Sequence, residues 1–367
     1  MKILFVVEQY TDEGSRYYRE FFRHLKGMGA SVVVVNLNQS SSFRNDVSEF
    51  VDGFHSLGLS GGYHRCIPAL RGLLRRESPS VVQGMEIIPT FYAALALTTI
   101  LRGRPVLVYG RRHGPTEGAV ARLMDWVAFR AARRVIAVSG AMADVARAEH
   151  PLARGKVTSI RSGVSLMPVP GPPKEGSGVL DALRADGAFK ALLLARIRPG
   201  KGHGVALRAA EILKARGKPI RLLFVGEGGG RKDMENEVGI RGLTEDVVFT
   251  GHMEDIRGIL ELADAMLIPS SADAFPKVAV EAFAAGLPVV ASGVGGLKEL
   301  VVHGETGLTV EPGDPEGLAD ALADLMENPE KGRRLAANAL GVYRKELTPQ
   351  VMVERYFQEY QRLVGVG

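Results

Sequence analysis

Two carboxylates lie eight positions apart in SADAFPKVAVEAFAAGLPVVASGVGG, the stretch at residues 271–296. Pro276 suits the first position of a helix, and Gly286 would end that helix. Asp273 would then lie on the loop before the helix and Glu281 in its second turn. A buried carboxylate needs hydrogen-bond donors, which the hydroxyl groups of a sugar or a ribose can supply. Asp273 has an alternative explanation as an ordinary helix N-cap.

A second cluster, LARIRPGKGHG at residues 194–204, combines cations with glycines. Arg196 ends a predicted strand, and Lys201 comes just before a predicted helix. Fixed cations, backbone amides and a helix dipole all favour an anion, so the cluster predicts a diphosphate site. The Gly-Lys-Ser/Thr sequence of a Walker loop is absent. A solvated basic turn is the alternative explanation.

The elements that would position these residues are short apolar segments that alternate with segments of helical periodicity. This alternation predicts α/β architecture, with parallel sheets covered on both faces. In the first half, strands are predicted at 2–9, 30–37, 80–84, 105–110, 135–139 and 156–160, and helices at 15–29 and 118–135. In the second half, strands are predicted at 189–197, 220–228, 247–251, 265–270, 287–292 and 307–312, and helices at 204–217 and 315–329, with two more at the end.

A segment rich in Pro and Gly, SLMPVPGPPKEGSG at residues 165–178, interrupts the alternation. We therefore predict a Rossmann-like domain at 1–165, a linker at 166–188 and a second Rossmann-like domain at 189–340. A closing helix at 341–367 is expected to pack back on the first domain. Ligands bind at the carboxyl ends of parallel strands, so the cleft between two such domains is the expected site.

A nicotinamide enzyme is the first hypothesis to exclude. The best glycine cluster after a strand is VGEGGG at 225–230, and position 231 is Arg where the dinucleotide fingerprint needs a third Gly. No acidic residue ends a second strand at the required distance. The first predicted strand is followed by EQYTDEGS, which contains no fingerprint.

Charge and cysteine content narrow the class of protein. Residues 1–165 hold 22 Lys and Arg against 13 Asp and Glu, a net +9, and the rest of the chain is net −4. A basic half favours anionic partners, although ordinary solvated arginines explain it equally well. The single cysteine, Cys66, is expected to be a buried structural thiol. No recognition motif for nucleic acid is present, so nucleic acid is not an expected partner.

The order of motifs after residue 189 resembles the retaining GT-B glycosyltransferases of family 4 type. The motifs are Arg196, Lys201, VGEG, DAFPKVAVEAFAAGLPVVAS, GVGGLKELV and GETGLTVEPGDPEGLADAL. The resemblance implies the α/β GT-B fold, with two Rossmann-like domains that face each other across a cleft. It implies transfer of a hexose-type sugar from a UDP-, GDP- or ADP-linked donor to a glycan or lipid-linked acceptor. The expected setting is the synthesis of cell-envelope polysaccharide or glycolipid.

The resemblance also implies roles for individual residues. Arg196 and Lys201 would grip the donor diphosphate, Glu281 would bind the ribose, and Asp273 would lie near the donor sugar. His113, in YGRRHGP, matches the family's active-site histidine, and a structural loop histidine is the alternative. The remaining candidates for donor, phosphate or acceptor contacts are Gly14, Ser15, Arg111, Arg112, Gly226, Phe275, Pro276, Lys277 and Val278.

No cofactor and no metal are expected, because the leaving phosphate would act as the base and no His/Cys cluster has the spacing of metal ligands. Three positions depart from the family pattern. Asp273 stands where Glu is usual, the Gly14–Ser15 loop has one glycine, and Ser162 replaces Asn. A degenerate GT-B protein that binds nucleotide-sugars without turnover is therefore the alternative function.

The helix predicted at 118–135 has two explanations. Trp126 and several arginines could make it an interfacial helix, or it could face the core of a basic domain. We expect a cytoplasmic protein, because the N-terminal segment is predicted as a strand and not as a signal peptide. Peripheral contact with an anionic membrane is expected as a further property.

Overall fold

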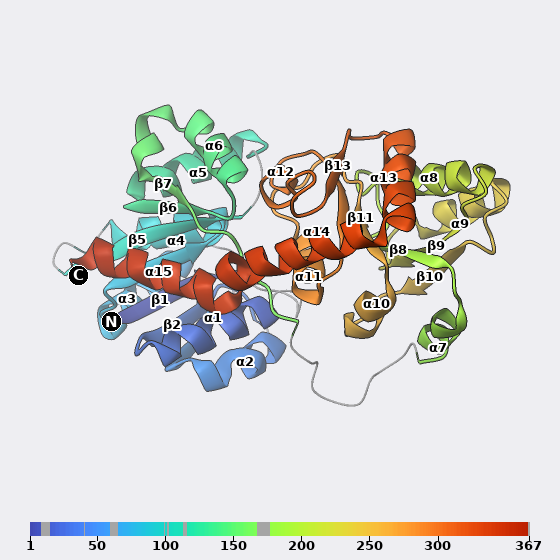
Figure 1. The fold of residues 1–367 in the computed structure, drawn as a ribbon. Helices are drawn as coiled ribbons and strands as arrows, with labels where there is room; N and C mark the ends of the chain where they lie inside the picture. Colours follow the sequence, from blue (N-terminus) through green and yellow to red (C-terminus); the bar gives the residue numbers. More distant parts are fainter. Residues whose placement is uncertain are drawn as a thin grey trace. The chain divides into compact units, whose positions relative to one another are not determined.

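The computed structural model describes residues 1–8, 15–39, 41–58, 65–98, 100, 103–112, 116–166 and 177–365. Contacts divide the chain into two compact units. The first comprises Met1–Gly163 with Thr348–Gly367, and the second comprises Val164–Leu347. Each unit is built on one parallel sheet, as the alternation of strands and helices predicted (Figure 1).

The first unit has a seven-stranded sheet in the order β3-β2-β1-β4-β5-β6-β7. Its strands are β1 (Lys2–Val7), β2 (Ser31–Asn36), β3 (Gly53–Ser56), β4 (Val81–Met85), β5 (Val106–Arg111), β6 (Arg134–Ala137) and β7 (Val157–Ser159). Its helices are α1 (Ser15–Gly27), α2 (Ser41–Val47), α3 (Cys66–Glu77), α4 (Ile87–Leu97), α5 (Ala119–Ala131), α6 (Gly140–Glu149) and α15 (Pro349–Val364), with short turns η1 (Ser48–Phe50) and η3 (Pro151–Lys156).

The core of this unit includes the carboxyl-terminal helix. Helices α1, α2 and α15 share one apolar cluster with alternate residues of β1 and β2. Phe21 of α1 meets Phe5 of β1 at 5.6 Å between ring centroids and Tyr356 of α15 at 5.0 Å. Tyr360 donates a buried hydrogen bond of 2.8 Å to Oε1 of Gln83 in β4. Helix α15 therefore belongs to the fold of the first unit.

The lone cysteine lies where the sequence analysis expected it. Cys66 begins α3 and is fully buried. Burial, with a smaller contribution from Glu8, raises the pKa of its thiol to about 11. The thiol therefore remains protonated at neutral pH, which suits a structural role.

The second unit has a six-stranded sheet in the order β10-β9-β8-β11-β12-β13. Its strands are β8 (Phe189–Leu194), β9 (Ile220–Val225), β10 (Val247–Gly251), β11 (Ala265–Ile268), β12 (Val289–Ser292) and β13 (Leu308–Val310). Its helices are α7 (Ser177–Ala185), α8 (His203–Ala215), α9 (Arg231–Ile240), α10 (Arg257–Leu262), α11 (Lys277–Ala285), α12 (Leu297–Leu300), α13 (Pro315–Glu327) and α14 (Pro329–Val342), with a π-helical turn η4 (Tyr343–Leu347).

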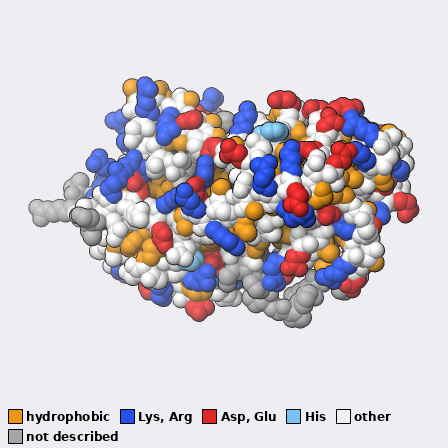
Figure 2. All heavy atoms as spheres, viewed as in Figure 1, with side chains coloured by type: hydrophobic (Ala, Val, Ile, Leu, Met, Phe, Trp, Pro, Cys, Tyr) orange, Lys and Arg blue, Asp and Glu red, His pale blue; other side chains and the backbone are white. Residues whose placement is uncertain are grey.

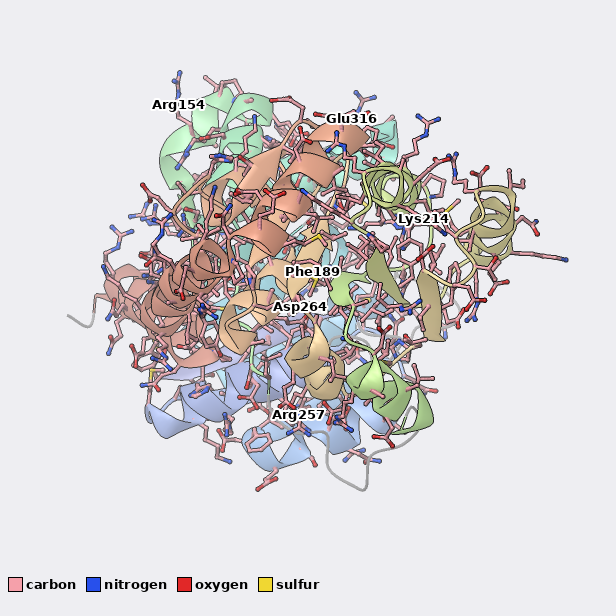
Figure 3. All side chains as sticks on the ribbon, turned by 45° about the vertical axis from the view of Figure 1, so that its right-hand side comes forward. Arg154, Phe189, Lys214, Arg257, Asp264 and Glu316 are labelled. Carbon is pink, nitrogen blue, oxygen red and sulfur yellow. The ribbon has the colours of Figure 1, made fainter. Side chains whose placement is uncertain are left out.

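Two apolar clusters hold helices against the faces of this sheet. One joins α8, α9 and α13 to alternate residues of β8 and β9, and the other joins α7, α10, α11 and α12 to the opposite face. At the amino-terminal edge, Oδ2 of Asp264 accepts a hydrogen bond of 2.7 Å from the Lys190 amide. Figure 3 shows Asp264 beside Phe189, at the start of β8.

Several elements were not predicted from the sequence. Strand β3 and helices α2, α3, α4 and α6 lie in segments without a clear period, and α7 lies within the segment 166–188. Helix α7 packs Leu183 into the core of the second unit.

On the face drawn in Figure 2, Lys and Arg side chains gather near the region where Figure 1 draws β6 and β7. Across the described ranges, no helix combines the length and hydropathy needed to span a bilayer.

The Tyr360–Gln83 hydrogen bond gives a test of the role of α15. In Tyr360→Phe, the buried Gln83 Oε1 loses this donor, so the free energy of unfolding should fall by about 1–3 kcal/mol. Urea unfolding followed by circular dichroism measures this change. A difference below about 0.5 kcal/mol would show that water replaces the phenol and that the buried bond is not needed.

Candidate active site

The order of the second sheet reverses at β8, which lies between β9 and β11. In open parallel sheets, ligands bind beyond the carboxyl ends of the strands at such a reversal. The loops that follow these three strands carry Arg196 and Lys201, Gly226, and Asp273, respectively. The topology therefore brings both clusters found in the sequence to one edge of one sheet.

Glycines allow the loops after β8 and β9 to lie against each other. A Cβ atom on Gly226, whose φ is +137°, would be 2.2 Å from the carbonyl oxygen of Ala195. A Cβ on Gly228 would be 2.3 Å from the carbonyl oxygen of Ile197. Hydrogen bonds between Ile197 and both Glu227 and Gly230 fasten the two loops together. Any side chain at these two glycines would separate the loops.

The same close packing joins the loop after β8 to the loop after β11. A Cβ on Gly202, whose φ is +80°, would lie 2.1 Å from the carbonyl oxygen of Pro269. The Ser271 amide donates a hydrogen bond of 3.0 Å to the Gly200 carbonyl. A Cβ on Gly295, in the loop after β12, would meet the carbonyl oxygen of Asp273 at 2.2 Å. The backbone around Lys201 and Asp273 is thus fixed from both sides.

An ion pair joins the two charged residues that the sequence analysis placed in different clusters. Lys201 Nζ lies 3.0 Å from Asp273 Oδ2, and the two side chains are 23% and 14% exposed. The alternative explanation of Asp273 as an N-cap is wrong. Pro276 occupies the N-cap of α11, and no side chain caps that helix. The short Asp side chain instead contacts the cation predicted to bind diphosphate.

Helix α11 differs from the predicted helix by one residue at its start. It begins at Lys277, so Pro276 lies at the N-cap and not at the first helical position. Gly286 ends it in a left-handed conformation, as predicted. Glu281 is half-buried in the second turn, between Val280 and Ala282, which are buried. Its carboxylate therefore lies on a helix held firmly by the core.

The remaining donor candidates of the second unit lie on the same loops. Arg196 is exposed two residues beyond β8, and Lys277 is exposed at the start of α11. Phe275 and Val278 are partly buried and pack against the core, on either side of the amino terminus of α11. The first-turn amides of a helix have no acceptor within that helix, which suits contact with an anion.

His203 is a residue of this edge that the sequence analysis did not single out. It is the first residue of α8, 4% exposed, and packs edge-on against Phe224 of β9. Within the described part of the chain, neither ring nitrogen has a hydrogen-bond partner. Burial, reinforced by the charge of Lys201, lowers the pKa of His203 to about 4. The imidazole is therefore neutral at physiological pH, directly behind the predicted diphosphate site.

In the first unit, strand ends carry a smaller cluster around Arg112. The guanidinium of Arg112 lies 4.2 Å from the centroid of the Tyr17 ring, and its Nε is 3.8 Å from Glu86 Oε1. Glu86 has φ +77° and ψ 179°, a conformation almost restricted to glycine. Such strain costs about 1–3 kcal/mol and is common at functional sites. Nothing in the sequence predicted Glu86 or Tyr17.

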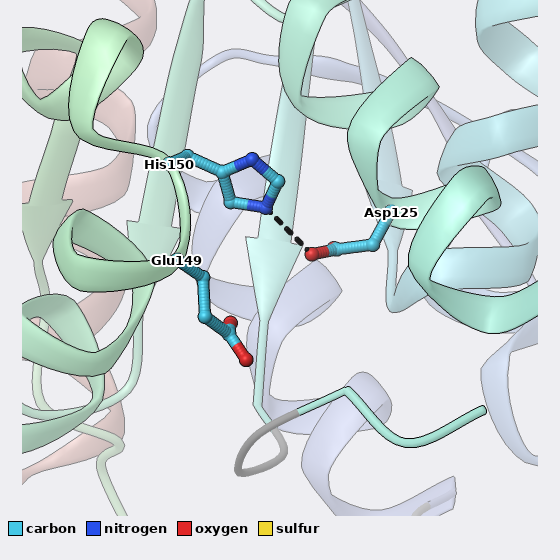
Figure 4. Close-up of side chains that lie close together, drawn as sticks. All are labelled: Asp125, Glu149 and His150. Atoms are coloured by element: carbon cyan, nitrogen blue, oxygen red, sulfur yellow. Dashed lines mark hydrogen bonds and ion pairs between the residues drawn. The ribbon is translucent and has the colours of Figure 1, made fainter. Parts of the chain in front are cut away.

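Arg111 has a different environment, which argues against its predicted contact with phosphate or acceptor. It is 2% exposed, and its guanidinium pairs with Glu149 and lies 3.7 Å from Asp125 Oδ2. Asp125 also accepts from the Tyr109 hydroxyl at 2.7 Å and lies 2.8 Å from His150 Nε2 (Figure 4). Arg111 is therefore a buried member of an ion-pair network within the first unit.

The same network is the one group of possible metal ligands found among the described residues. Single ligand atoms of Asp125, Glu149 and His150 lie within 4.8 Å of one another. The spacing along the chain did not reveal this group, because Asp125 is on α5, whereas Glu149 is the last residue of α6 and His150 follows it. The Arg111 guanidinium already supplies positive charge to both carboxylates, so a divalent ion would compete with it. We assign the network a structural role.

Three candidates cannot be placed. His113 and Gly14 lie outside the described residues, and so does the side chain of Ser15, the first residue of α1. Their roles stay predictions.

Comparison with known families identifies both halves of the chain. Residues 14–167 match the family described as Glycosyltransferase Family 4, and residues 181–341 match the family described as Glycosyl transferases group 1. A D-inositol 3-phosphate glycosyltransferase of Paenarthrobacter aurescens is 30% identical over 84% of this chain and 76% of its own length. The chain belongs to the group 1 glycosyltransferases.

Other relatives share only part of their length with this chain. An alpha-D-kanosaminyltransferase of Streptomyces kanamyceticus is 34% identical over 40% of this chain and 39% of its own. For six such relatives, the shared part spans 37 to 55% of their length. The HepE protein of Anabaena, solved with UDP, has a TM-score of 0.81 at 20% identity, over 99% of this chain and all of that one. This likeness confirms the GT-B fold.

The packing around Gly202 gives a test with a matched control. Gly202→Ala would place a methyl group against the Pro269 carbonyl at a positive φ, so unfolding free energy should fall by more than about 1 kcal/mol. Gly204→Ala, two residues later in α8, meets no atom within 4 Å and should be neutral or stabilising. Urea unfolding of both variants measures the difference, and equal stabilities would contradict the close packing of the loops.

His203 predicts a pH dependence of stability. Its pKa is about 4 in the folded chain and 6.5 ordinarily, so the unfolded chain binds the extra proton between these values. Stability should therefore fall as the pH decreases from about 6.5 to about 4, by up to about 3 kcal/mol from this group. His203→Leu should flatten the fall over this window. Parallel stability profiles for the two proteins would show that folding does not lower the pKa of His203.

Proposed function

We propose that this chain is a retaining glycosyltransferase that moves a hexose-type sugar from a nucleotide diphosphate donor to a glycan or lipid-linked acceptor. The observation that carries the proposal is the Lys201–Asp273 pair at the reversal of the second sheet, beside the amino terminus of α8. Cation, helix dipole and first-turn amides together favour a diphosphate. Membership of the group 1 family supplies the reaction class.

The donor would be held at two ends. Lys201 and Arg196 would bind the diphosphate and stabilise the charge that grows on it as the sugar leaves. Glu281 on α11 would accept hydrogen bonds from the ribose, and Asp273 would lie near the sugar. The UDP bound by HepE of Anabaena is consistent with a nucleoside diphosphate ligand, and UDP, GDP and ADP are all candidates for this chain.

The chemistry would need no metal and no other cofactor. The departing phosphate would take the proton of the acceptor hydroxyl on the face from which it leaves, so the configuration at the sugar would be retained. Lys201 would offset the phosphate charge that a metal offsets in other transferases. His113 would face the donor sugar, as the family resemblance implies.

The class of acceptor is proposed from the net charge of the first half of the chain and from the family resemblance. The first half of the sequence carries the net +9, which suits an anionic or phosphate-linked acceptor. We propose cell-envelope polysaccharide or glycolipid synthesis as the setting, at the cytoplasmic side of the membrane with peripheral contact to anionic lipid. Arg112, beside Glu86 and Tyr17 at a strand end, is the candidate for acceptor or phosphate contact in that half.

The test is calorimetry of the full chain with UDP, GDP and ADP in the presence of a chelator. One of them is expected to bind, and binding of none would overturn the proposal. The matching nucleotide-sugars are then assayed for hydrolysis, and NMR reads the configuration of the released sugar. Retention supports the proposed mechanism, whereas inversion contradicts it. Binding without any hydrolysis or transfer would favour the alternative, a nucleotide-sugar-binding protein without turnover.

Variants of the charged residues of the site test what each residue contributes to turnover. Lys201→Ala and Glu281→Ala should each lower kcat/KM by about 10²–10³, because a desolvated charged contact contributes about 2–4 kcal/mol in the transition state. Lys232→Ala, at an exposed lysine of α9, is the control and should retain full activity. Unchanged turnover in Lys201→Ala would remove the diphosphate assignment.

A further inference from the structure

Helix α5 in the first unit presents an apolar stripe to solvent. Val120, Leu123 and Trp126 are 74%, 61% and 52% exposed, and they follow one another at intervals of three residues along one side of the helix. The opposite side is buried through Asp125, Ala128 and Phe129. Clusters of large exposed apolar side chains in a soluble domain commonly mark a contact surface.

A basic pocket adjoins the same stripe. It has a volume of about 540 Å³ and lies between the last turn of α5 and the start of β5. Trp126 belongs to both the stripe and the pocket. The other lining residues that matter here are Arg104, Pro105, Val127, Arg130 and Arg133.

The pocket arginines are not neutralised within the described part of the chain. None of Arg104, Arg130 and Arg133 has a carboxylate within 4.0 Å there, although Arg134, the next residue, pairs with Glu359. Burial, reinforced by the charges of Arg130 and Arg133, lowers the pKa of the neighbouring Lys156. The pocket therefore concentrates positive charge that no carboxylate of the described residues offsets within 4.0 Å, which favours an anionic partner.

Two more exposed side chains lie on a turn that contacts the end of α5. Leu152 and Arg154 lie on η3, which contacts the end of α5 through a hydrogen bond of 3.1 Å from Lys156 Nζ to the Arg130 carbonyl. Leu152 is fully exposed, and Arg154 points away from the chain (Figure 3). The gathering of Lys and Arg side chains near β6 and β7 in Figure 2 is consistent with this position.

We propose that α5 and this pocket are the membrane-contact site of the protein, with the pocket arginines on the phosphate of an anionic phospholipid headgroup. Val120, Leu123 and Trp126 would enter the interface beside it. Charge and apolar surface occur together here, as they do in helices that lie in a bilayer interface. A soluble anion would leave the apolar stripe exposed. The inference deepens the proposed peripheral contact and does not depend on the donor chemistry.

Trp126 provides a direct probe, because it is the single tryptophan of the chain. Its fluorescence is recorded with phosphatidylcholine vesicles, and with vesicles in which about one third of the lipid is phosphatidylglycerol. Emission is expected to shift to shorter wavelength and to be quenched by brominated acyl chains only with the anionic vesicles. The shift should weaken between about 0.1 M and about 0.5 M salt, since the Debye length shortens.

Matched variants distinguish vesicle binding at this site from a general effect of the protein's positive charge. Arg130→Gln with Arg133→Gln should weaken vesicle binding by about tenfold or more, because each basic residue near an anionic surface contributes roughly fivefold. Arg208→Gln with Arg344→Gln removes the same charge from exposed positions of the second unit and is the control. Leu123→Ser should weaken pelleting with anionic vesicles, whereas Ile240→Ser, at a residue 81% exposed on α9, should not.

The outcomes distinguish this inference from the proposed function. Loss of vesicle binding in the α5 variants, with nucleoside diphosphate binding intact, supports it. No change in Trp126 emission with anionic vesicles overturns it, even when the chain binds a nucleotide. It is also overturned when inorganic phosphate alone reproduces the shift, or when the two double arginine variants lose binding equally.

Discussion

The ion pair between Lys201 and Asp273 depends on the packing of three loops at the carboxyl ends of β8, β9 and β11. Glycines at 202, 226 and 228 let these loops approach until a single methyl group would collide with a carbonyl oxygen. The close approach fixes the backbone on both sides of a partly buried cation and carboxylate. An ion pair of this kind contributes little to the free energy of unfolding by itself. Its main effect is to fix the position of the Lys201 ammonium group.

The pair also gives a physical meaning to the departure from the family pattern at position 273. An Asp side chain is one methylene shorter than Glu, and here its carboxylate lies on the lysine at 3.0 Å. In the proposed complex, Lys201 would exchange this carboxylate for phosphate oxygens or contact both, since both groups are anions that accept hydrogen bonds from an ammonium group. His203, two residues after Lys201, is neutral, so it adds no second positive charge that would compete with Lys201 for the phosphate.

Much of the fold and of the donor site could be predicted from the sequence, because both rest on local signals. Continuous apolar strands, the helix that ends at Gly286, and the order of motifs around Arg196, Lys201 and Glu281 are all readable along the chain. Arg111 shows the limit of such prediction. Its neighbours Asp125 and Glu149 come from two later helices, and only their packing reveals that the guanidinium is buried. The strained backbone of Glu86 likewise has no sequence signal.

The central proposal is that Lys201 binds the diphosphate of the donor, so it should favour a nucleoside diphosphate over its monophosphate. The direct measurement is the affinity of the native chain and of Lys201→Met for the nucleoside diphosphate that binds and for its monophosphate. The native chain should prefer the diphosphate by about tenfold or more, a difference of about 1.4 kcal/mol. In Lys201→Met this preference should largely disappear while monophosphate affinity changes little. An unchanged preference in the variant would contradict the account.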